Sequence, residues 1–357
     1  MKERIMRKKR TILADPDVQG TFHVFSRCVQ RKSLLGDGKT SRGSTTRRRH
    51  IVLKRIKTLA AAFAIDVINI SIMLNHFHLT LRNRPDLVKL MSDEEVAQRY
   101  LKIYPGYCQA TADARNKSPT PPSEKDVLKL AQDKAKIAKY RKVLSSISRF
   151  MQAFNFYTSR YFNIVDGTVG AFWESRYKIK QLLDDLALLL CAFYIDSNPI
   201  RANASLTPEK SEYTSAYYQI RAASILAKMP HIPPEKLPNS FLCPVTISKN
   251  EADKLKRLLP TRASEFGFTY MSSEEYLIAL DLVARIISKK HVGAIPADLP
   301  PIFERLKLNW ESVAHLVEAY EELFCTFVGS KKSLEEKATA MHCGTLKCPA
   351  ATQGLIP

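Results

Sequence analysis

The most informative segment of the chain reads Asp66-Val-Ile-Asn-Ile-Ser-Ile-Met-Leu-Asn-His-Phe-His-Leu-Thr-Leu-Arg82. It is rich in β-branched and apolar residues that alternate with polar ones, a pattern typical of β-strands. Because the segment is longer than a typical strand, we expect two strands joined by a hairpin near residues 74–76, with Asn75 as the turn residue. The first strand would run from about Val67 to Met73 and the second from about His76 to Leu81.

The second predicted strand carries two histidines, His76 and His78, on either side of Phe77. Side chains at alternate strand positions lie on the same face of a sheet. The two imidazoles could therefore converge on one divalent ion, while Phe77 turns into a core. The pattern is short, and from spacing alone two exposed or internally bonded histidines are the more common outcome. His23 stands alone on an earlier predicted strand, and we interpret it as structural.

The rest of the chain mixes strand, helix and loop patterns. Periodicity predicts a strand at 21–29, a loop at 33–46, and helices at 47–64, from 92 onwards, within 124–161, and at 181–197, 248–258, 273–290 and 310–327. Five prolines between Pro230 and Pro244 indicate a linker. We therefore divide the chain into a basic arm at 1–17, a main domain at 18–225, a linker at 226–247, a helical C-terminal extension at 248–330 and a loose tail at 331–357.

The charge of the chain is strongly positive. It has 55 Lys and Arg against 35 Asp and Glu, a net charge of +20. Residues 1–60 alone hold 17 basic and 4 acidic side chains. Such an imbalance is typical of proteins that bind a polyanion, most often nucleic acid. Arg47, Arg48 and Arg49 lie in a predicted helix and are candidate DNA contacts, whereas a solvated tail explains residues 1–10 equally well.

Composition also indicates where in the cell the protein is expected. No apolar run reaches the length of a membrane span, and the first 20 residues are too charged for the core of a signal peptide. We therefore expect no membrane partner. The seven cysteines show no spacing typical of a disulfide framework, which favours a reducing, cytoplasmic location.

The predicted helix at 181–197 ends in Tyr194-Ile-Asp-Ser-Asn198-Pro199. Residues four positions apart share a face of a helix, so Tyr194 and Asn198 lie together. Asn198 can offer an amide oxygen to a hard cation, and Tyr194 can act as a nucleophile if its pKa falls from about 10. From residue types alone, a buried tyrosine before an Asn-Pro helix stop is the simpler interpretation.

Three motifs together resemble those of the single-tyrosine HUH transposases, and most of all the REP-associated tyrosine transposases and their larger relatives. They are Ile72-Met-Leu-Asn-His-Phe-His-Leu79, Gly170-Ala-Phe-Trp-Glu-Ser-Arg-Tyr-Lys178 and Tyr194-Ile-x-x-Asn-Pro-Ile-Arg-Ala202, which occur in that order. The resemblance covers roughly residues 18–222. Residues 260–325 also look like the C-terminal extension of the larger relatives.

The resemblance implies an α+β fold with a ferredoxin-like antiparallel sheet, helices on one of its faces and a helical C-terminal extension. It makes 18–225 the catalytic domain, His76 and His78 a metal-binding pair for Mg²⁺ or Mn²⁺, Asn198 a third ligand and Tyr194 the nucleophile. Such an enzyme cleaves and rejoins single-stranded DNA at hairpin-bearing ends through a 5′-phosphotyrosine intermediate. It would act as a homodimer, associated with the nucleoid.

Other residues and other functions remain as alternatives. Further candidate phosphate contacts are Arg27, Arg176, Lys178 and Arg201. Tyr161 is a weaker candidate nucleophile, and a zinc site is only faintly suggested by His342, Cys343 and Cys348. The chief alternative function is a domesticated, non-catalytic DNA-hairpin-binding protein, which would need none of the predicted catalytic residues. A metal-dependent nuclease that activates water would not need Tyr194.

Overall fold

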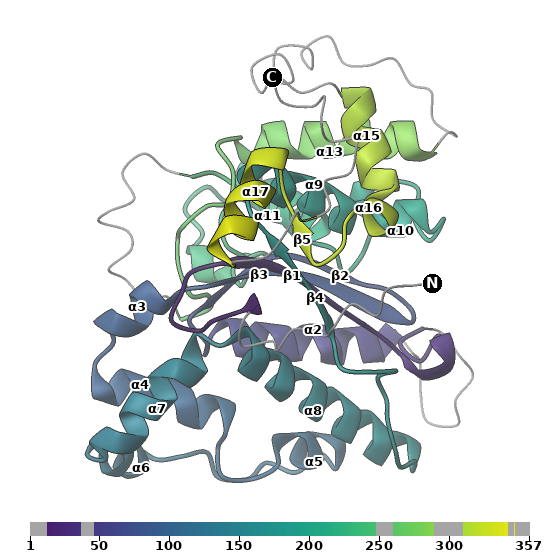
Figure 1. The fold of residues 1–357 in the computed structure, drawn as a ribbon. Coiled ribbons are helices and arrows are strands. Elements are labelled where there is room, and N and C mark those ends of the chain that lie inside the picture. The colour runs from purple at the N-terminus through teal and green to yellow at the C-terminus, as the bar shows by residue number, and fades with distance from the viewer. Residues whose placement is uncertain (1–12, 37–45, 248–259, 289–309, 342–345, 347–357) are drawn as a thin grey trace, which may run out of the picture.

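The computed structural model describes residues 13–36, 46–247, 260–288, 310–341 and 346. A five-stranded sheet with strand order β2-β3-β1-β4-β5 lies at the centre of the molecule (Figure 1). Its strands are β1 (Thr21–Arg27), β2 (Ile65–Ile72), β3 (His76–Asn83), β4 (Lys178–Leu182) and β5 (Phe327–Val328). Strands β1 to β4 pair antiparallel, and β5 pairs parallel to β4. The α+β class is thus confirmed, with a mixed sheet in place of the antiparallel one expected.

The hairpin predicted near residues 74–76 is confirmed. Strands β2 and β3 pair with Ile72 opposite Phe77, and the Met73 N–H donates to the His76 carbonyl oxygen at 2.9 Å. Asn75 anchors the turn to the chain beyond β1, because its carbonyl oxygen accepts from the Cys28 N–H at 2.7 Å and its Nδ2 donates to the Arg31 carbonyl oxygen at 3.0 Å. The turn therefore fixes the position at which β3 begins.

Helices cover both faces of the sheet, which differs from the expectation of helices on one face (Figure 1). On one face lie α2 (Thr46–Ala60) and α8 (Ile147–Asp166), and there Phe77 packs on Phe154. On the other lie α9 (Asp185–Asp196), α11 (Ser215–Lys228), α13 (Ser273–Ser288) and α15 (Trp310–Glu318). Every residue of α9 from Ala187 to Asp196 is buried. A helix that is apolar all round needs cover on both sides, and the C-terminal extension provides the second layer.

The remaining described elements are further helices and short 3₁₀ turns. They comprise α3 (Pro85–Leu90), α4 (Asp93–Ile103), α5 (Gln109–Ala114), α6 (Glu124–Ala131), α7 (Lys134–Leu144), α10 (Asn198–Arg201), α16 (Tyr320–Leu323), α17 (Lys331–Ala340), and the 3₁₀ turns η1 (Val29–Arg31), η2 (Pro208–Lys210) and η3 (Pro234–Lys236). Helix α4 begins as predicted, since Ser92 and Glu95 form a capping box.

Two segments differ from the predicted helices. The helix expected over 181–197 starts only after β4, because Gln181 pairs with Phe22 of β1 and Asp184 caps α9 by accepting from the Ala187 N–H at 2.8 Å. The single helix expected over 310–327 is divided into α15, α16 and β5. In addition, α17 is helical where a loose tail was expected.

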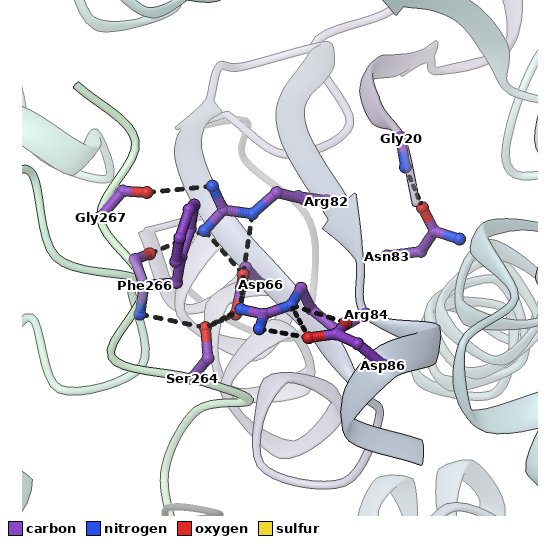
Figure 2. Close-up of polar contacts among 9 residues, drawn as sticks. All are labelled: Gly20, Asp66, Arg82, Asn83, Arg84, Asp86, Ser264, Phe266 and Gly267. Carbon is purple, nitrogen blue, oxygen red and sulfur yellow. Dashed lines mark hydrogen bonds and ion pairs between the residues drawn. The ribbon is translucent and has the colours of Figure 1, made fainter. Parts of the chain in front are cut away.

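A buried ionic cluster joins the extension to the sheet (Figure 2). Asp66 on β2 accepts hydrogen bonds from Arg82 at 2.8 and 2.9 Å, from Arg84 at 3.4 Å and from the Ser264 hydroxyl at 2.7 Å. Arg82 donates in turn to the Phe266 carbonyl oxygen at 2.7 Å. The segment after the linker is therefore tied to the start of β2 and the end of β3.

The segment expected as a proline-rich linker packs against the sheet in its second half. Phe241 and Leu242 are buried, and the Cys243 N–H donates to the Val67 carbonyl oxygen at 2.9 Å. The domain boundaries themselves stay predictions. Outside the described residues lie most of the basic arm, the predicted helix at 248–258, and His342, Cys343 and Cys348. None of the described helices combines the length and apolar character that crossing a lipid bilayer requires.

Candidate active site

A row of polar side chains lies on the α9 face of the sheet. Strand pairing places His78 of β3 opposite Phe25 of β1, and His23 of β1 opposite Lys180 of β4. His23 and His78 are both buried, at 0% and 2% exposure. Phe77, between the histidines in sequence, packs on the opposite face, as strand alternation predicts. The predicted histidine pair therefore faces the helix that carries the predicted nucleophile.

Hydrogen bonds leave one ring nitrogen of each predicted ligand available. His76 Nδ1 lies 2.6 Å from Asn75 Oδ1, and an amide oxygen only accepts, so Nδ1 donates this hydrogen bond and Nε2 carries the lone pair. His78 Nδ1 lies 2.9 Å from His23 Nε2, which directs its Nε2 away from the strand partner. A second residue that orients a histidine in this way is typical of metal ligands. His23 therefore contacts a predicted ligand, and its structural role stays a prediction.

Burial keeps the histidines of this row neutral. It is the main cause that lowers the pKa of His76 to about 4, with the Arg27 cation adding to the effect. The pKa of His78 is held well below its ordinary value, first by burial and then by the neighbouring His23. Burial also lowers the pKa of His23. Neutral imidazoles are the form that binds a metal ion.

Tyr194 of α9 packs directly on the histidines. Its ring centroid lies 5.4 Å from that of His78 and 5.9 Å from that of His23, both in edge-on arrangements. Its side chain is buried, with 3% exposure. Helix α9 crosses β2 and β3 because its apolar residues pack on them (Figure 1). The packing of α9 on the sheet therefore brings the motif that contains Tyr194 next to the motif that contains His76 and His78.

The Tyr194 hydroxyl is held by the C-terminal extension. It donates to Glu321 Oε1 of α16 at 2.9 Å. The Arg201 guanidinium lies over its ring, 4.6 Å from the centroid, and Arg201 also donates to the Glu318 carbonyl oxygen at 3.0 Å. Tyr320 stacks on the same ring at 4.6 Å. Burial, followed by the Glu321 charge, raises the pKa of Tyr194 above its ordinary value.

Asn198, the predicted third ligand, is buried at the first residue of α10 with 6% exposure. Its Nδ2 has no hydrogen-bond partner. No hydrogen bond or ring contact joins it to either histidine within the described residues. Among those residues, no group of three or more His, Cys, Asp and Glu side chains has a metal-binding arrangement. The histidine pair therefore offers two nitrogen ligands, and oxygen ligands would have to complete the site.

Two of the predicted DNA contacts lie beside the site. Arg27 is opposite His76 on β1, and the exposed Lys178 is opposite Phe25, with its Nζ 5.7 Å from the centre of that ring. Arg176 is exposed in the preceding segment. Arg201 contacts Tyr194 itself, so it belongs to the site rather than to its surroundings.

The basic run of α2 is arranged differently from the prediction. Arg48 is buried, forms an ion pair with Asp166 and lies over the Phe162 ring. Its charge is therefore used inside the fold and is not presented to DNA. Arg49 is half-buried over the Tyr213 ring at 4.7 Å, and the side chain of Arg47 lies outside the described part of the chain. Because α2 lies on the Phe77 face, this helix is across the sheet from Tyr194.

Tyr161, the rival nucleophile, is on α8 and therefore also across the sheet. It is 8% exposed and packs with Tyr157 and Phe162. The geometry places it in the core on that side, away from the histidine pair.

Sequence reasoning missed Glu321 and Lys180. Lys180 is 8% exposed, its Nζ has no hydrogen-bond partner, and it lies 4.8 Å from the Tyr320 ring centre. Burial lowers its pKa. A lysine at an inward-facing strand position would have been noticeable from the sequence if residues 178–182 had been predicted as a strand. Glu321 carries no such signal, because only packing of the extension brings it to Tyr194.

Comparisons with family models, with curated proteins and with solved structures found no match to this chain. The resemblance to the single-tyrosine HUH transposases therefore rests on the sequence motifs alone.

Proposed function

We propose that this protein is a transposase of the single-tyrosine HUH type, which cleaves and rejoins single-stranded DNA at hairpin-bearing ends. The observation that carries the proposal is the packing of Tyr194 against His78, whose Nδ1 is held by His23. The sequence motifs are distant in the chain, and nothing in their composition requires them to meet. A core tyrosine and a structural histidine pair would not need this juxtaposition.

The histidine pair is suited to hold a divalent ion. His76 and His78 would each contribute Nε2, and oxygen ligands from Asn198, water or the DNA phosphate would complete the coordination. A Mg²⁺ or Mn²⁺ ion bound there would supply positive charge against the phosphate oxygens. Arg27 and Lys178, at the same end of the sheet, would hold the neighbouring phosphates.

Tyr194 would be the nucleophile and Glu321 its proton acceptor. As the phenolic oxygen bonds to phosphorus, the O–H bond breaks and the proton passes to Glu321 Oε1, which already accepts it as a hydrogen bond. The bond from phosphorus to the 3′-oxygen breaks, and that oxygen leaves as a 3′-hydroxyl after taking up a proton. The product is a 5′-phosphotyrosine, and attack by another 3′-hydroxyl rejoins the strand without ATP.

The burial of Tyr194 affects how the reaction can start. Tyr194 is buried beneath Tyr320, Arg201 and Glu321. A phosphate can reach its hydroxyl only if the Tyr320 ring and the Arg201 guanidinium turn aside, so DNA binding would move these two side chains while Glu321 keeps its hydrogen bond to the hydroxyl. One tyrosine per chain implies that two chains cooperate to cleave two ends.

A covalent-adduct assay tests the proposal. Labelled hairpin DNA with a single-stranded flank is incubated with the protein and Mn²⁺, and a protein–DNA band is sought on a denaturing gel. We expect the band with wild-type protein, its loss in EDTA, and its loss in Tyr194→Phe. Tyr161→Phe is the matched control, because it removes a hydroxyl across the sheet, and it should retain the band.

Other outcomes would identify the alternatives. Cleavage that survives Tyr194→Phe would indicate a nuclease that activates water. Hairpin binding without cleavage in any divalent ion would indicate the non-catalytic, domesticated protein. We expect His76→Ala to lose the adduct while it keeps hairpin binding, and a parallel loss of both would contradict the metal role.

A further inference from the structure

Two adjoining cavities lie on the face of the sheet away from Tyr194. They have volumes of about 610 and 320 Å³ and are lined by α2, α4, α5, α7 and α8 with the intervening loops. Arg55, Tyr107 and Tyr157 line both. The two cavities therefore form one continuous recessed surface, which we call the aromatic groove.

Aromatic rings form much of the larger cavity. Tyr100 and Tyr140 stack face to face with centroids 3.5 Å apart, and Tyr104 lies 5.1 Å from Tyr100. Phe156 lines the same cavity and is 62% exposed. Partly exposed aromatic side chains that gather in a hollow are characteristic of binding sites rather than of solvated surface.

Cationic side chains accompany these rings. Lys54 and Lys102 line the smaller cavity, and Lys139 and Arg149 line the larger one. Asp113 lines the smaller cavity too, but its carboxylate accepts from the Tyr157 hydroxyl at 2.5 Å. The groove is therefore positive as well as aromatic.

Arg55 provides an independent sign that the groove is built for a ligand. Its side chain is 6% exposed and lies over the Tyr157 ring at 4.7 Å. One terminal nitrogen donates to the Ala153 carbonyl oxygen, but Nε has no hydrogen-bond partner among the residues that the structure describes. A buried, charged donor without an acceptor is costly unless something supplies one, and this guanidinium lines both cavities.

We propose that the aromatic groove binds the unpaired bases of a single-stranded nucleic acid. Bases would stack on Phe156 and Tyr104, as they do on aromatic side chains of single-strand-binding proteins generally. Lys54 and Arg149 would pair with phosphates, and Arg55 would donate to a base edge or phosphate. An acidic peptide would pair with the cationic side chains but would have no bases to stack on the aromatic rings.

The groove and the candidate active site are separated by the sheet. Binding in the groove therefore needs neither Tyr194 nor a metal ion, and it adds a second nucleic-acid contact to the proposed function. It also gives a use to Lys54 and Arg55 of α2, which lie across the sheet from the histidines.

The test is equilibrium binding of a fluorescent twelve-residue oligothymidine to the full chain in EDTA, followed by anisotropy. We expect Phe156→Ala and Arg149→Ala each to weaken binding about tenfold. The matched controls are Tyr270→Ala, an aromatic residue that is 73% exposed on the extension, and Arg221→Ala on α11. Both should bind as wild type does.

An abasic oligonucleotide of the same length separates base stacking from charge. We expect it to bind at least tenfold more weakly than oligothymidine and to be insensitive to Phe156→Ala. Equal binding of the two oligonucleotides, or unchanged binding by Phe156→Ala and Arg149→Ala, would overturn the proposal. Because the assay contains no metal and scores no adduct, it can succeed even if the cleavage assay of Tyr194 fails.

Discussion

At the scale of single residues, the hydrogen bond from Tyr194 to Glu321 has the clearest chemical consequence. The hydroxyl of a buried tyrosine is a poor nucleophile because burial disfavours its phenolate. The carboxylate that accepts its proton belongs to the C-terminal extension. The extension is therefore part of the candidate active site rather than an appendage to it.

We expect Glu321→Gln to slow formation of the covalent adduct by about a hundredfold, since an amide accepts the hydrogen bond but not the proton. Hairpin affinity should stay at the wild-type value. The rate is measured from adduct formed against time in Mn²⁺. Glu322→Gln, the exposed neighbour on α16, is the control and should react at the wild-type rate. A wild-type rate for Glu321→Gln would remove Glu321 from the reaction.

The lowered pKa of His76 predicts how Mn²⁺ binding depends on pH. Protons compete with metal ions for Nε2, and an ordinary histidine begins to bind them below about pH 6.5. Because burial places the pKa of His76 at about 4, Mn²⁺ affinity should stay constant from pH 8 to about 5.5 and fall as pH approaches 4. Calorimetric titration measures it. An affinity that falls steadily from pH 7 would show that the imidazoles are more exposed to solvent than the structure has them.

At the scale of elements, α9 links the two halves of the candidate site. Its residues are buried on all sides, so the sheet and the extension both pack on it. The hairpin of β2 and β3 fixes His76 and His78 on the face that α9 covers. Asp66, at the start of β2, binds Arg82 and Arg84 at the end of β3 and so also attaches the extension (Figure 2).

Asp66→Asn should lower the free energy of unfolding by about 3–5 kcal/mol, because it leaves the buried Arg82 guanidinium without its carboxylate and removes one of the two carboxylates that Arg84 contacts. The side chains of Arg82 and Arg84 are 6% and 2% exposed. Urea unfolding measures the change. The control is Asp17→Asn, which breaks a solvent-exposed pair with Lys142 and should cost at most about 1 kcal/mol. Similar losses in the two variants would mean that the Asp66 cluster is not buried in solution.

At the scale of the whole molecule, positive charge lies on both sides of the sheet. Arg27 and Lys178 are near the histidines, whereas Lys54 and Arg55 of α2 line the aromatic groove. The net charge of +20 is therefore not concentrated at the active site. Arg48 shows that part of it stabilises the fold instead, through its ion pair with Asp166.

Hairpin binding should weaken steeply with salt, since each Lys or Arg that neutralises a phosphate releases a counterion. With four or more contacts to a single strand, a plot of log affinity against log salt concentration should have a slope steeper than about −3. Replacing Lys178 by Ala should make the slope shallower by about 1. Fluorescence anisotropy from 50 to 300 mM salt measures it. A flat titration would contradict phosphate contacts as the source of affinity.

Strand positions, the hairpin turn and one helix start follow from the amino-acid pattern alone. Alternation specified β1, β2 and β3 and put Phe77 opposite the histidines, Asn75 marked the turn, and Ser92 marked the start of α4. These depend on neighbours in the chain, so pattern suffices to predict them. The predicted helix starts too early because Leu182 continues the apolar pattern of α9 while it pairs with Thr21 of β1.

Contacts between side chains that are distant in the sequence depend on tertiary packing. Apolar periodicity says that α9 is buried, but not that its Tyr194 packs on His78 or that Glu321 of α16 accepts its hydroxyl proton. The sequence likewise does not predict that Arg48 is buried. Nor does it predict that Tyr100, Tyr140 and Phe156 line one groove. Such contacts depend on how helices and sheet pack together, and packing is set by the shape of the whole core, which no local pattern encodes.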